Sequence, residues 1–534
     1  MRILLGPVLH HEPPTGPATW RFSVHVMTDI PDTAATPVTC RFADAAVTVA
    51  APVLVAAFPE QSRTVWAFVI EVARTAVEQH LAYTVSLGED SRTFDGVAVP
   101  ALAQMPRTAF FSCNGFSSAA VMRQTADPNA LWIRMLAEHR QGMAAPTRDV
   151  PCGVHVLLGG GDQLYADMLP ALADLDAMSS RDLRRLKSSG MRRQRALREY
   201  LDLYTVRWSH PDVAAMLGRV PGVFTWDDHD IFDGWGSHGR DIQENEAYLD
   251  VYFAARAAFR ALQLGGDPSG RSPTLVKGPV HATAGPFVQF VRLHAGNDVV
   301  DVLLTDSRSE RTPEQVFSAT QWELLRAQLD APAPAPLHRR HLLVVSSIPV
   351  VYLRFRAVGW ILRRVPGVQE IEDDLLDQWE HPAHLNERAR FILSLLQHQK
   401  KTGCRVTILS GDVHAGALGR IESTRSDHRQ DGSQEPARIT QITSSGIVHP
   451  SPSSWQRSVL ELLGTEGDDE VASGVTTRML AIDSETDRLW TRNFLLLDFE
   501  GASMSTPHQL WARFVPEGRR SPRSLTIPPL AADA

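Results

Sequence analysis

VHVLLGGGDQLYAD (residues 154–167) is the most informative part of the sequence for the fold class, because an apolar run leads directly into glycines and ionisable side chains. Residues 154–158 have the composition of a short buried strand. Three glycines follow, then Asp162, Tyr165 and Asp167, and neither a GxxxxGK[ST] nor a GxGxxG spacing is present. The stretch therefore predicts a strand that ends in carboxylate chemistry rather than in a nucleotide-phosphate cradle.

Five further apolar runs lead in the same way into the polar sequences SCN, WDDHD, TDSRSER, SSIP and SGDVH. These runs are residues 109–111, 222–225, 299–304, 342–345 and 406–409. Long helical segments such as 245–263 lie between the runs, which is typical of an α/β domain. Because ligands bind at the carboxyl ends of strands in open α/β sheets, we expect six strand ends to form one composite site.

The N-terminal part has a different hydrophobic pattern. Residues 21–26, 64–70 and 81–87 alternate apolar and polar side chains with period two, which is typical of half-buried strands. The pattern predicts a smaller all-β sandwich domain over residues 1–105, followed by the α/β catalytic domain over residues 106–534.

Composition excludes several classes of protein. The 534 residues include 53 Lys and Arg against 61 Asp and Glu, a net charge of -8, so long nucleic acid and anionic membranes are unfavourable partners. The longest nearly apolar run, residues 47–58, is far short of the ~20 residues that cross a bilayer. Four cysteines without a CxxC pair do not indicate a disulfide framework. With no signal peptide or twin-arginine pattern at the N-terminus, we expect a cytoplasmic protein; the sequence predicts no oligomeric state.

Two clusters of ionisable residues indicate a metal centre. WDDHD places Asp227, Asp228, His229 and Asp230 on one turn, where repulsion between carboxylates is costly unless a cation is bound. In SGDVH, strand alternation would direct Asp412 and His414 to one side. An isolated Asp at a strand end, such as Asp162, is more often a helix cap than a metal ligand. Here, however, oxygen, nitrogen and sulfur donors follow several strands, and this set favours a transition-metal or mixed-metal centre.

The ordered motifs GGGDQLYAD, WDDHD and SGDVH, with SCN before them and TDSRSER between, resemble the PhoD-like phosphatases. This alkaline phosphatase D family lies within the calcineurin-like metallophosphoesterase superfamily. The likeness covers roughly residues 105–450 and extends to DLLDQWEHPAHLNE (residues 374–387). It implies a four-layer α/β/β/α sandwich preceded by a smaller N-terminal β-sandwich domain.

By this resemblance, Asp162 would bridge two metal ions and Tyr165 would bind the first as a phenolate. Cys113 would replace the usual Asp of the first strand, and His414 would complete the first site. A phenolate and a thiolate are strong anionic donors, so this ligand set favours Fe(III).

The resemblance places Asp228 and Asp412 on the second metal. Both are hard oxygen donors, which suit Ca(II), or alternatively Mg(II) or Mn(II). The superfamily usually supplies one further metal-binding His from the strand before the last motif. The corresponding sequence here, VVSSIP (residues 344–349), contains no His and offers only Ser346 and Ser347. This again indicates a hard cation rather than a zinc pair.

Five other residues are candidates for roles around the ligands or in contact with substrate: Asn114, Asp227, Asp230, Arg308 and His449. Arg308 would clamp a phosphate or pair with a nearby acid. His449 would line the pocket or be an ordinary loop histidine. The basic run 181–198 is interpreted as a solvated helical face, with an electrostatic funnel for anions as the alternative.

These observations predict an enzyme that hydrolyses phosphomonoesters or phosphodiesters of small molecules. A hydroxide held between the metals would attack phosphorus, and the catalytic residue His229 would contact a phosphoryl oxygen or protonate the leaving group. The alternatives are a nucleotide-directed phosphodiesterase or nuclease on the same scaffold, and a catalytically silent protein that binds a phosphorylated ligand.

Overall fold

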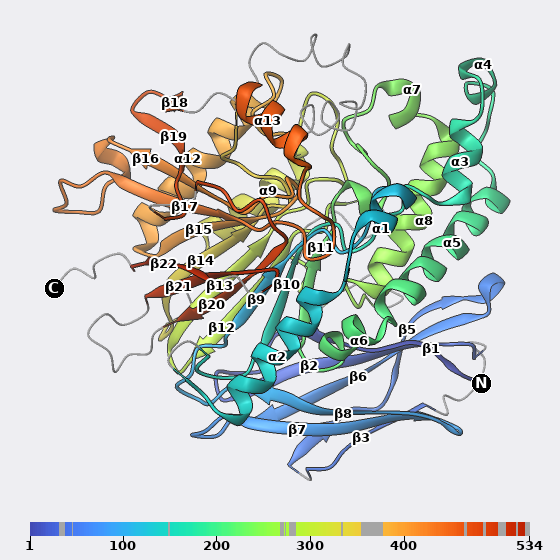
Figure 1. The fold of residues 1–534 in the computed structure, drawn as a ribbon. Helices are drawn as coiled ribbons and strands as arrows, with labels where there is room; N and C mark the ends of the chain where they lie inside the picture. Colours follow the sequence, from blue (N-terminus) through green and yellow to red (C-terminus); the bar gives the residue numbers. More distant parts are fainter. Residues whose placement is uncertain are drawn as a thin grey trace.

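The computed structural model describes the chain outside residues 31–37, 45, 148–149, 267–271, 273, 277–284, 333–334, 354–377, 464–466, 484–486, 500–508, 519–521 and 529–534. The part of the family-like segment at residues 374–377 lies outside the described residues. Two large sheets lie against each other, with helices on their outer sides (Figure 1).

The first sheet has eleven strands within the described ranges. Their spatial order is β22 (Arg523–Ile527), β21 (Leu510–Pro516), β20 (Asn493–Phe499), β9 (Thr108–Phe111), β10 (Val156–Gly160), β11 (Gly222–Thr225), β1 (Ile3–His11), β2 (Thr19–Thr28), β6 (Arg63–Ala73) and β4 (Val47–Val49), with β5 (Val53–Phe58) also beside β6. Strands β9, β10 and β11 are parallel, so their carboxyl ends meet at one edge.

The second sheet has eight described strands. Their order is β12 (Gln289–Ala295), β13 (Asp298–Leu304), β14 (His338–Val345), β15 (Arg405–Ser410), β17 (Ala437–Thr443), β16 (Ala417–Ser423), β19 (Val475–Leu480) and β18 (Asp469–Ala472). Strands β13, β14 and β15 run parallel. All six apolar runs expected to be strands are therefore strands.

Up to β8 (Asp90–Val99), the described N-terminal residues form strands and one short 3-10 turn, and no α-helix. The third sheet, β3 (Val38–Phe42), β7 (Gln79–Leu87) and β8, lies along the lower edge of Figure 1. However, β1 pairs with β11 at His10 and Gly222, so the N-terminal strands extend the first large sheet. The mixed α/β class is confirmed, while the domain boundary at residue 105 stays a prediction.

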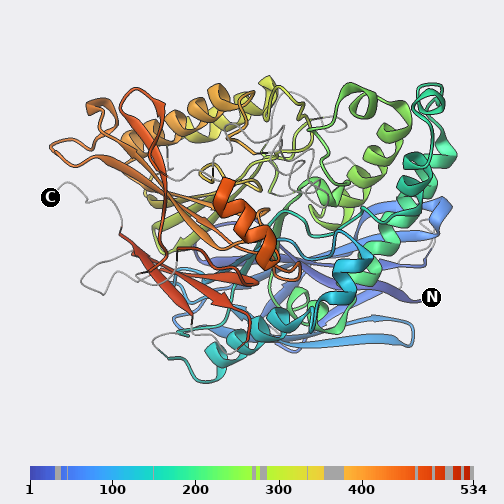
Figure 2. The same cartoon turned by 45° about the horizontal axis from the view of Figure 1, so that its top comes forward.

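Three buried clusters explain the layers. Phe111 and Phe224 pack against one group of helices, of which α5 and α8 are the longest. Leu158 and Leu343 meet between the two sheets. On the far side, Val344 packs with residues of α9 and α12. Figure 2 shows these two helices together on one side of the molecule, away from α5 and α8.

The helices follow amphipathic patterns with recognisable starts. Their bounds are α1 (Ala119–Gln124), α2 (Ala130–Ala144), α3 (Pro170–Asp176), α4 (Ser180–Leu183), α5 (Gly190–Trp208), α6 (Pro211–Leu217), α7 (Arg240–Gln243), α8 (Glu246–Leu262), α9 (Ala319–Asp330), α12 (Leu385–Thr402) and α13 (Ser454–Leu463). The expected helix at 245–263 is α8. It starts at Asn245, whose side chain accepts a hydrogen bond from the Ala247 N–H and so satisfies a free donor of the first turn.

Much of the charge of the basic run 181–198 is paired on the helical layer. Arg192 and Arg193 both contact the buried carboxylate of Asp250, at 2.9 and 3.1 Å. Lys187 pairs with Glu246 at 2.9 Å. These contacts favour the structural interpretation of the run over an electrostatic funnel.

No helix in the described parts of the chain is long and apolar enough to cross a membrane.

Candidate metal centre and substrate pocket

The loops after the parallel strands of both sheets are joined by backbone hydrogen bonds. The N–H of Asn114, after β9, donates to the carbonyl of Asp162, after β10, at 2.7 Å. The N–H of Gly411, after β15, donates to the carbonyl of Ser347, after β14, at 3.1 Å. Ser112 forms an isolated parallel bridge with Gly446 across the two sheets. The loops that the sequence analysis expected to form one composite site therefore lie next to one another at the strand ends.

Four of the candidate ligands have a left-handed backbone. The φ angles are 53° at Cys113, 53° at Asp162, 70° at Asp412 and 50° at His414. Among the described residues only two others that are not glycine, Ser62 and Asp127, have positive φ. Such backbone costs free energy and persists where the surroundings enforce it, often at functional sites. Backbone strain is thus concentrated at the strand ends where the motifs lie.

Asp412 and His414 do line the same pocket, as the sequence predicted. The reason differs from the expected strand alternation, because β15 ends at Ser410. The two left-handed residues, not a pleated strand, orient the side chains.

Four carboxylates meet at the centre of the site. One oxygen of each of Asp162, Asp227, Asp228 and Asp412 lies within 4.8 Å of those of the other three. Asp162, Asp227 and Asp228 are buried, and Asp412 is half-buried. Oxygen donors at this spacing suit a hard divalent cation.

A buried arginine holds two of these carboxylates from behind. The Arg308 Nε donates to Asp227, and Nη2 donates to Asp228 at 3.3 Å. Nη1 donates to the carbonyl of Trp235 at 3.0 Å, and the side chain is fully buried. Arg308 does not line the pocket, so its guanidinium positions the carboxylates rather than facing a ligand there.

The carboxylate charge that Arg308 does not neutralise is suited to binding a cation. The Oδ1 of Asp162 is buried and has no hydrogen-bond partner among the described residues. Burial, together with the charges of Asp227, Asp228 and Asp230, raises the pKa of Asp162 well above its ordinary value, although His229 opposes the shift. A bound cation would reverse this shift by stabilising the ionised carboxylate. The donor set therefore fits a metal ion.

The other expected ligands of the first metal lie beside this group without belonging to it. The Sγ of Cys113 is 3.5 Å from Oδ2 of Asp162. The hydroxyl of Tyr165 is 3.1 Å from Nε2 of His414. Burial raises the pKa of both the Cys113 thiol and the Tyr165 phenol well above their ordinary values, and the negative charge of Asp162 adds to both shifts. A highly charged cation would be needed to deprotonate them.

His229 forms a pair with a carboxylate that the sequence marked but to which it gave no role. The Nδ1 of His229 lies 2.9 Å from Oδ2 of Asp167. Burial alone would lower the pKa of His229, but Asp167 and Asp228 outweigh it and raise the pKa well above the ordinary value. The imidazole also stacks on Tyr165 with ring centroids 4.2 Å apart, and it lines the pocket. The hydrogen bond to Asp167 therefore fixes one edge of the imidazole ring, and the stacking on Tyr165 fixes one face.

His449 stacks on two predicted ligands, His414 and Tyr165. Its ring centroid is 3.8 Å from that of His414 and 5.3 Å from that of Tyr165. Nδ1 donates to the carbonyl of Pro450 at 3.0 Å, which leaves Nε2 near the Ser117 hydroxyl at 3.3 Å. Burial lowers the pKa of His449 to about 3. The side chain therefore lies in the site rather than in a separate loop.

Asp230 and Asn114 support the loops. Asp230 accepts hydrogen bonds from the N–H groups of Leu164 and Asp227, both at 3.0 Å, and burial raises its pKa to about 7. The Asn114 carbonyl oxygen accepts from Trp132 Nε1 at 2.9 Å and from Arg207. Neither side chain lines the pocket. Asp230 fastens the loop of Asp162 to the turn of Asp227.

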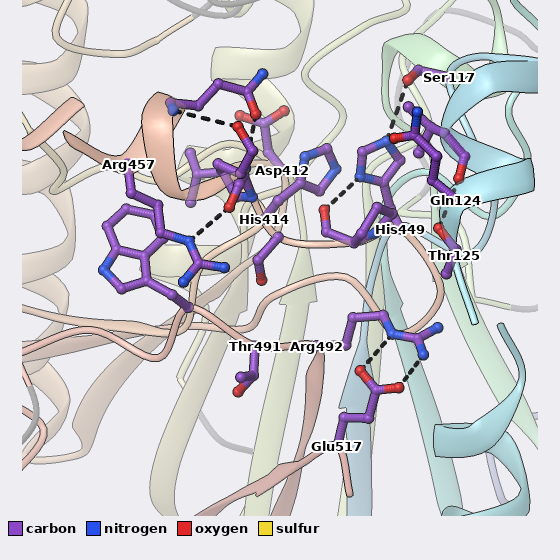
Figure 3. A pocket seen from close by; sticks show the side chains of 18 of the residues that line it. Ser117, Gln124, Thr125, Asp412, His414, His449, Arg457, Thr491, Arg492 and Glu517 are labelled. Carbon is purple, nitrogen blue, oxygen red and sulfur yellow. Dashed lines mark hydrogen bonds and ion pairs between the residues drawn. The ribbon is translucent and has the colours of Figure 1, made fainter. Parts of the chain in front are cut away.

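The pocket beside the centre has a volume of about 560 Å³. His229, Asp412, His414 and His449 line its inner end. Figure 3 shows Ser117, Gln124 and Thr125 on one side of Asp412, His414 and His449, and Arg457 on the other side. Such a volume accommodates an organic group much larger than a phosphate ion.

Sequence reasoning missed several residues at this site. Gln378 donates to Oδ2 of Asp412 at 3.0 Å. Arg457 and Trp490 line the outer pocket. Gln378 lies inside the family-like segment, which could have indicated it, whereas no local pattern marked Arg457 or Trp490.

Comparisons with known proteins show what the chain is similar to. The family described as PhoD related phosphatase matches residues 143–366. The uncharacterized protein YGR266W of Saccharomyces cerevisiae is 25% identical over 430 residues, which are 68% of this chain and 59% of that protein. The chain thus spans less than two thirds of the length of this relative. The solved structure of PhoD superposes with a TM-score of 0.53 at 13% identity, covering 98% of this chain and 88% of PhoD. That likeness shows a shared fold.

Proposed function

We propose, on the premise that this chain is a PhoD-like phosphatase as its family match and fold indicate, that it hydrolyses phosphoric esters of small molecules at the metal centre. One observation carries the proposal. Four carboxylate oxygens within 4.8 Å of one another lie beside a pocket that His229 also lines. A cation held there would neutralise a phosphate group, and the pocket would receive the rest of the ester.

The donor atoms divide into two sets. Asp228 and Asp412, with Asp227 close by, would hold a hard cation such as Ca(II), Mg(II) or Mn(II). Cys113, Tyr165 and His414 would hold Fe(III), with Asp162 shared between the two ions. When bound, such ions stabilise charge on phosphoryl oxygens and lower the pKa of a water molecule.

The protein supplies orientation and a proton. Asp167 holds His229 through Nδ1, so Nε2 is the ring nitrogen that remains for substrate. In our proposal water attacks phosphorus, the bond from phosphorus to the ester oxygen breaks, and Nε2 of His229 gives its proton to the departing oxygen. One proton of the attacking water stays on the phosphate product, and the other returns to Nε2 of His229. A positioned acid of this kind contributes roughly 10²- to 10⁴-fold to the rate.

The test compares p-nitrophenyl phosphate with bis-p-nitrophenyl phosphate, with and without added Ca(II), and measures bound metal by elemental analysis. We expect turnover of at least one substrate by the parent protein. Asp162→Asn should abolish turnover and reduce bound metal, because its carboxylate contacts both donor sets. Asp174→Asn is the matched control, since Asp174 is 60% exposed and pairs with Arg195 on the surface.

Metal content and rate that both survive in Asp162→Asn would refute the assignment of the site. No turnover by a metal-loaded parent would instead favour a protein that only binds phosphorylated ligands.

A further inference from the structure

The outer end of the pocket contains an arginine that the site described above does not use. Arg457 lies in the first turn of α13, is half-buried and lines the pocket. Its Nε donates to the carbonyl of Pro452 at 2.6 Å, and its guanidinium carbon lies 5.7 Å from the ring centroid of Trp490. One hydrogen bond and one aromatic ring therefore orient the guanidinium.

The two terminal nitrogens of Arg457 are available to a ligand. Among the described residues, none accepts a hydrogen bond from Nη1 or Nη2 of Arg457. Figure 3 shows the guanidinium reaching into the pocket on one side of Asp412 and His414. A guanidinium fork of this kind matches the two oxygens of a phosphate or carboxylate.

The other arginine that lines the pocket, Arg492, already donates its hydrogen bonds to protein groups. Arg492 is 3% exposed, and its Nε donates to Glu517 at 2.8 Å. Its Nη1 and Nη2 donate to backbone carbonyls, including those of Pro128 and Asp127. Of the two arginines that line the pocket within the described part of the chain, Arg457 is therefore the one that remains for an anion of the substrate.

We propose that the pocket is built for phosphate esters whose organic part carries a second anionic group, which the Nη1 and Nη2 of Arg457 bind while the scissile phosphate lies at the metal centre. This inference rests on the proposed phosphoester hydrolysis and narrows its substrate class. The volume of about 560 Å³ leaves room for an organic spacer between the two anions. Trp490 acts by holding the guanidinium in place.

The test uses matched substrates of increasing length. Alkyl monophosphates, the corresponding α,ω-alkanediol bisphosphates and ω-carboxyalkyl phosphates, with three to eight carbons, are compared by released phosphate. At the best length, kcat/KM should be roughly 10- to 100-fold higher with a second anion than without, the range of a charge-assisted hydrogen bond. The bisphosphate and carboxylate series identify which anion is preferred.

Arg457→Gln should reduce this ratio of kcat/KM values to near two for the bisphosphates, which carry two equivalent phosphates, and to near one for the ω-carboxyalkyl phosphates. Arg457→Lys should restore part of the ratio, and Trp490→Leu should lower it by a smaller factor. The surface variant Arg425→Gln, an arginine outside the pocket paired with Asp427, should keep the parent ratio. A parent ratio near two for the bisphosphates and near one for the ω-carboxyalkyl phosphates, or an unchanged ratio in Arg457→Gln, overturns this inference while leaving phosphoester hydrolysis intact. Failure of the metal-loaded parent to hydrolyse any ester, including p-nitrophenyl phosphate, overturns the proposed function itself.

Discussion

Replacing His11 by Leu should make the folded protein markedly less sensitive to acid. His11 lies on β1, is 1% exposed and packs against Trp20 with ring centroids 5.1 Å apart. Both of its ring nitrogens are buried without a hydrogen-bond partner among the described residues. Burial, with a smaller effect from His294, lowers its pKa from 6.5 to about 4.

The sign follows from proton binding. Between pH 6.5 and about 4 the imidazole is protonated in the unfolded chain and neutral in the folded one, so acid favours unfolding in this window. The full shift of about 2.5 pH units corresponds to about 3.4 kcal/mol at about 1.36 kcal/mol per unit. About 1.5 of these units lie between pH 6.5 and pH 5, so His11 should account for about 2 kcal/mol of the stability lost on going from pH 7 to pH 5.

The assay is urea unfolding followed by tryptophan fluorescence at pH 7 and at pH 5. At pH 7, His11→Leu should stay within about 1.5 kcal/mol of the parent, because an apolar side chain of similar volume replaces an unpaired ring. Between pH 7 and pH 5 the free energy of unfolding of the variant should change by about 2 kcal/mol in its favour relative to the parent. The variant should therefore be the more stable protein at pH 5. His338→Leu, whose replaced side chain is 61% exposed, controls for the loss of a histidine and should not reproduce the effect.

An equal loss of stability in parent and His11→Leu between pH 7 and pH 5 would refute the reasoning. The other buried histidines, such as His139 with a pKa of about 4, remain in both proteins and cancel in this comparison. Because His294 interacts with His11, its contribution is measured separately by the double variant.

Two further predictions concern the site. His229→Ala should lower kcat by roughly 10²-fold or more while metal stoichiometry is retained, as expected for a positioned acid; Asp167→Asn should lose activity as well, and the double variant should be little worse than His229→Ala because the two side chains act together. Loss of a metal ion in His229→Ala, measured by elemental analysis, would make His229 a ligand instead. Protein containing Fe(III) bound by Tyr165 and Cys113 should be coloured, and Tyr165→Phe should shift or weaken the visible band without a large change in packing, since the ring is kept. An unchanged spectrum, or an active enzyme without iron, would remove Tyr165 from the site.

Local sequence patterns were enough to predict the strands and the motifs at their ends. Short apolar runs such as those before Gly159 and before Gly411 are strands because burial on both faces requires continuous apolar side chains, a local property that can be read directly. The crowding of carboxylates in WDDHD also predicted a cation, since their repulsion depends on residues adjacent in the chain.

Other features depend on residues that are far apart in the chain. The pairing of Arg308 with Asp227 and Asp228 connects positions about 80 residues apart, so neighbouring acids such as Asp306 were equally plausible partners from sequence. The contact of Tyr165 with His414 and the stacking of His449 on both depend on how the two sheets meet.

Only the tertiary structure brought Arg457 and Trp490 to the pocket and joined β1 to β11. Hydrophobic periodicity decides which face of a strand or helix is buried, but it carries no information about which distant element covers that face. The left-handed backbone of Asp162, Asp412 and His414 was likewise not predicted, because Asp and His adopt this conformation more often than most residues but still in a small minority of positions, and the surrounding fold decides which.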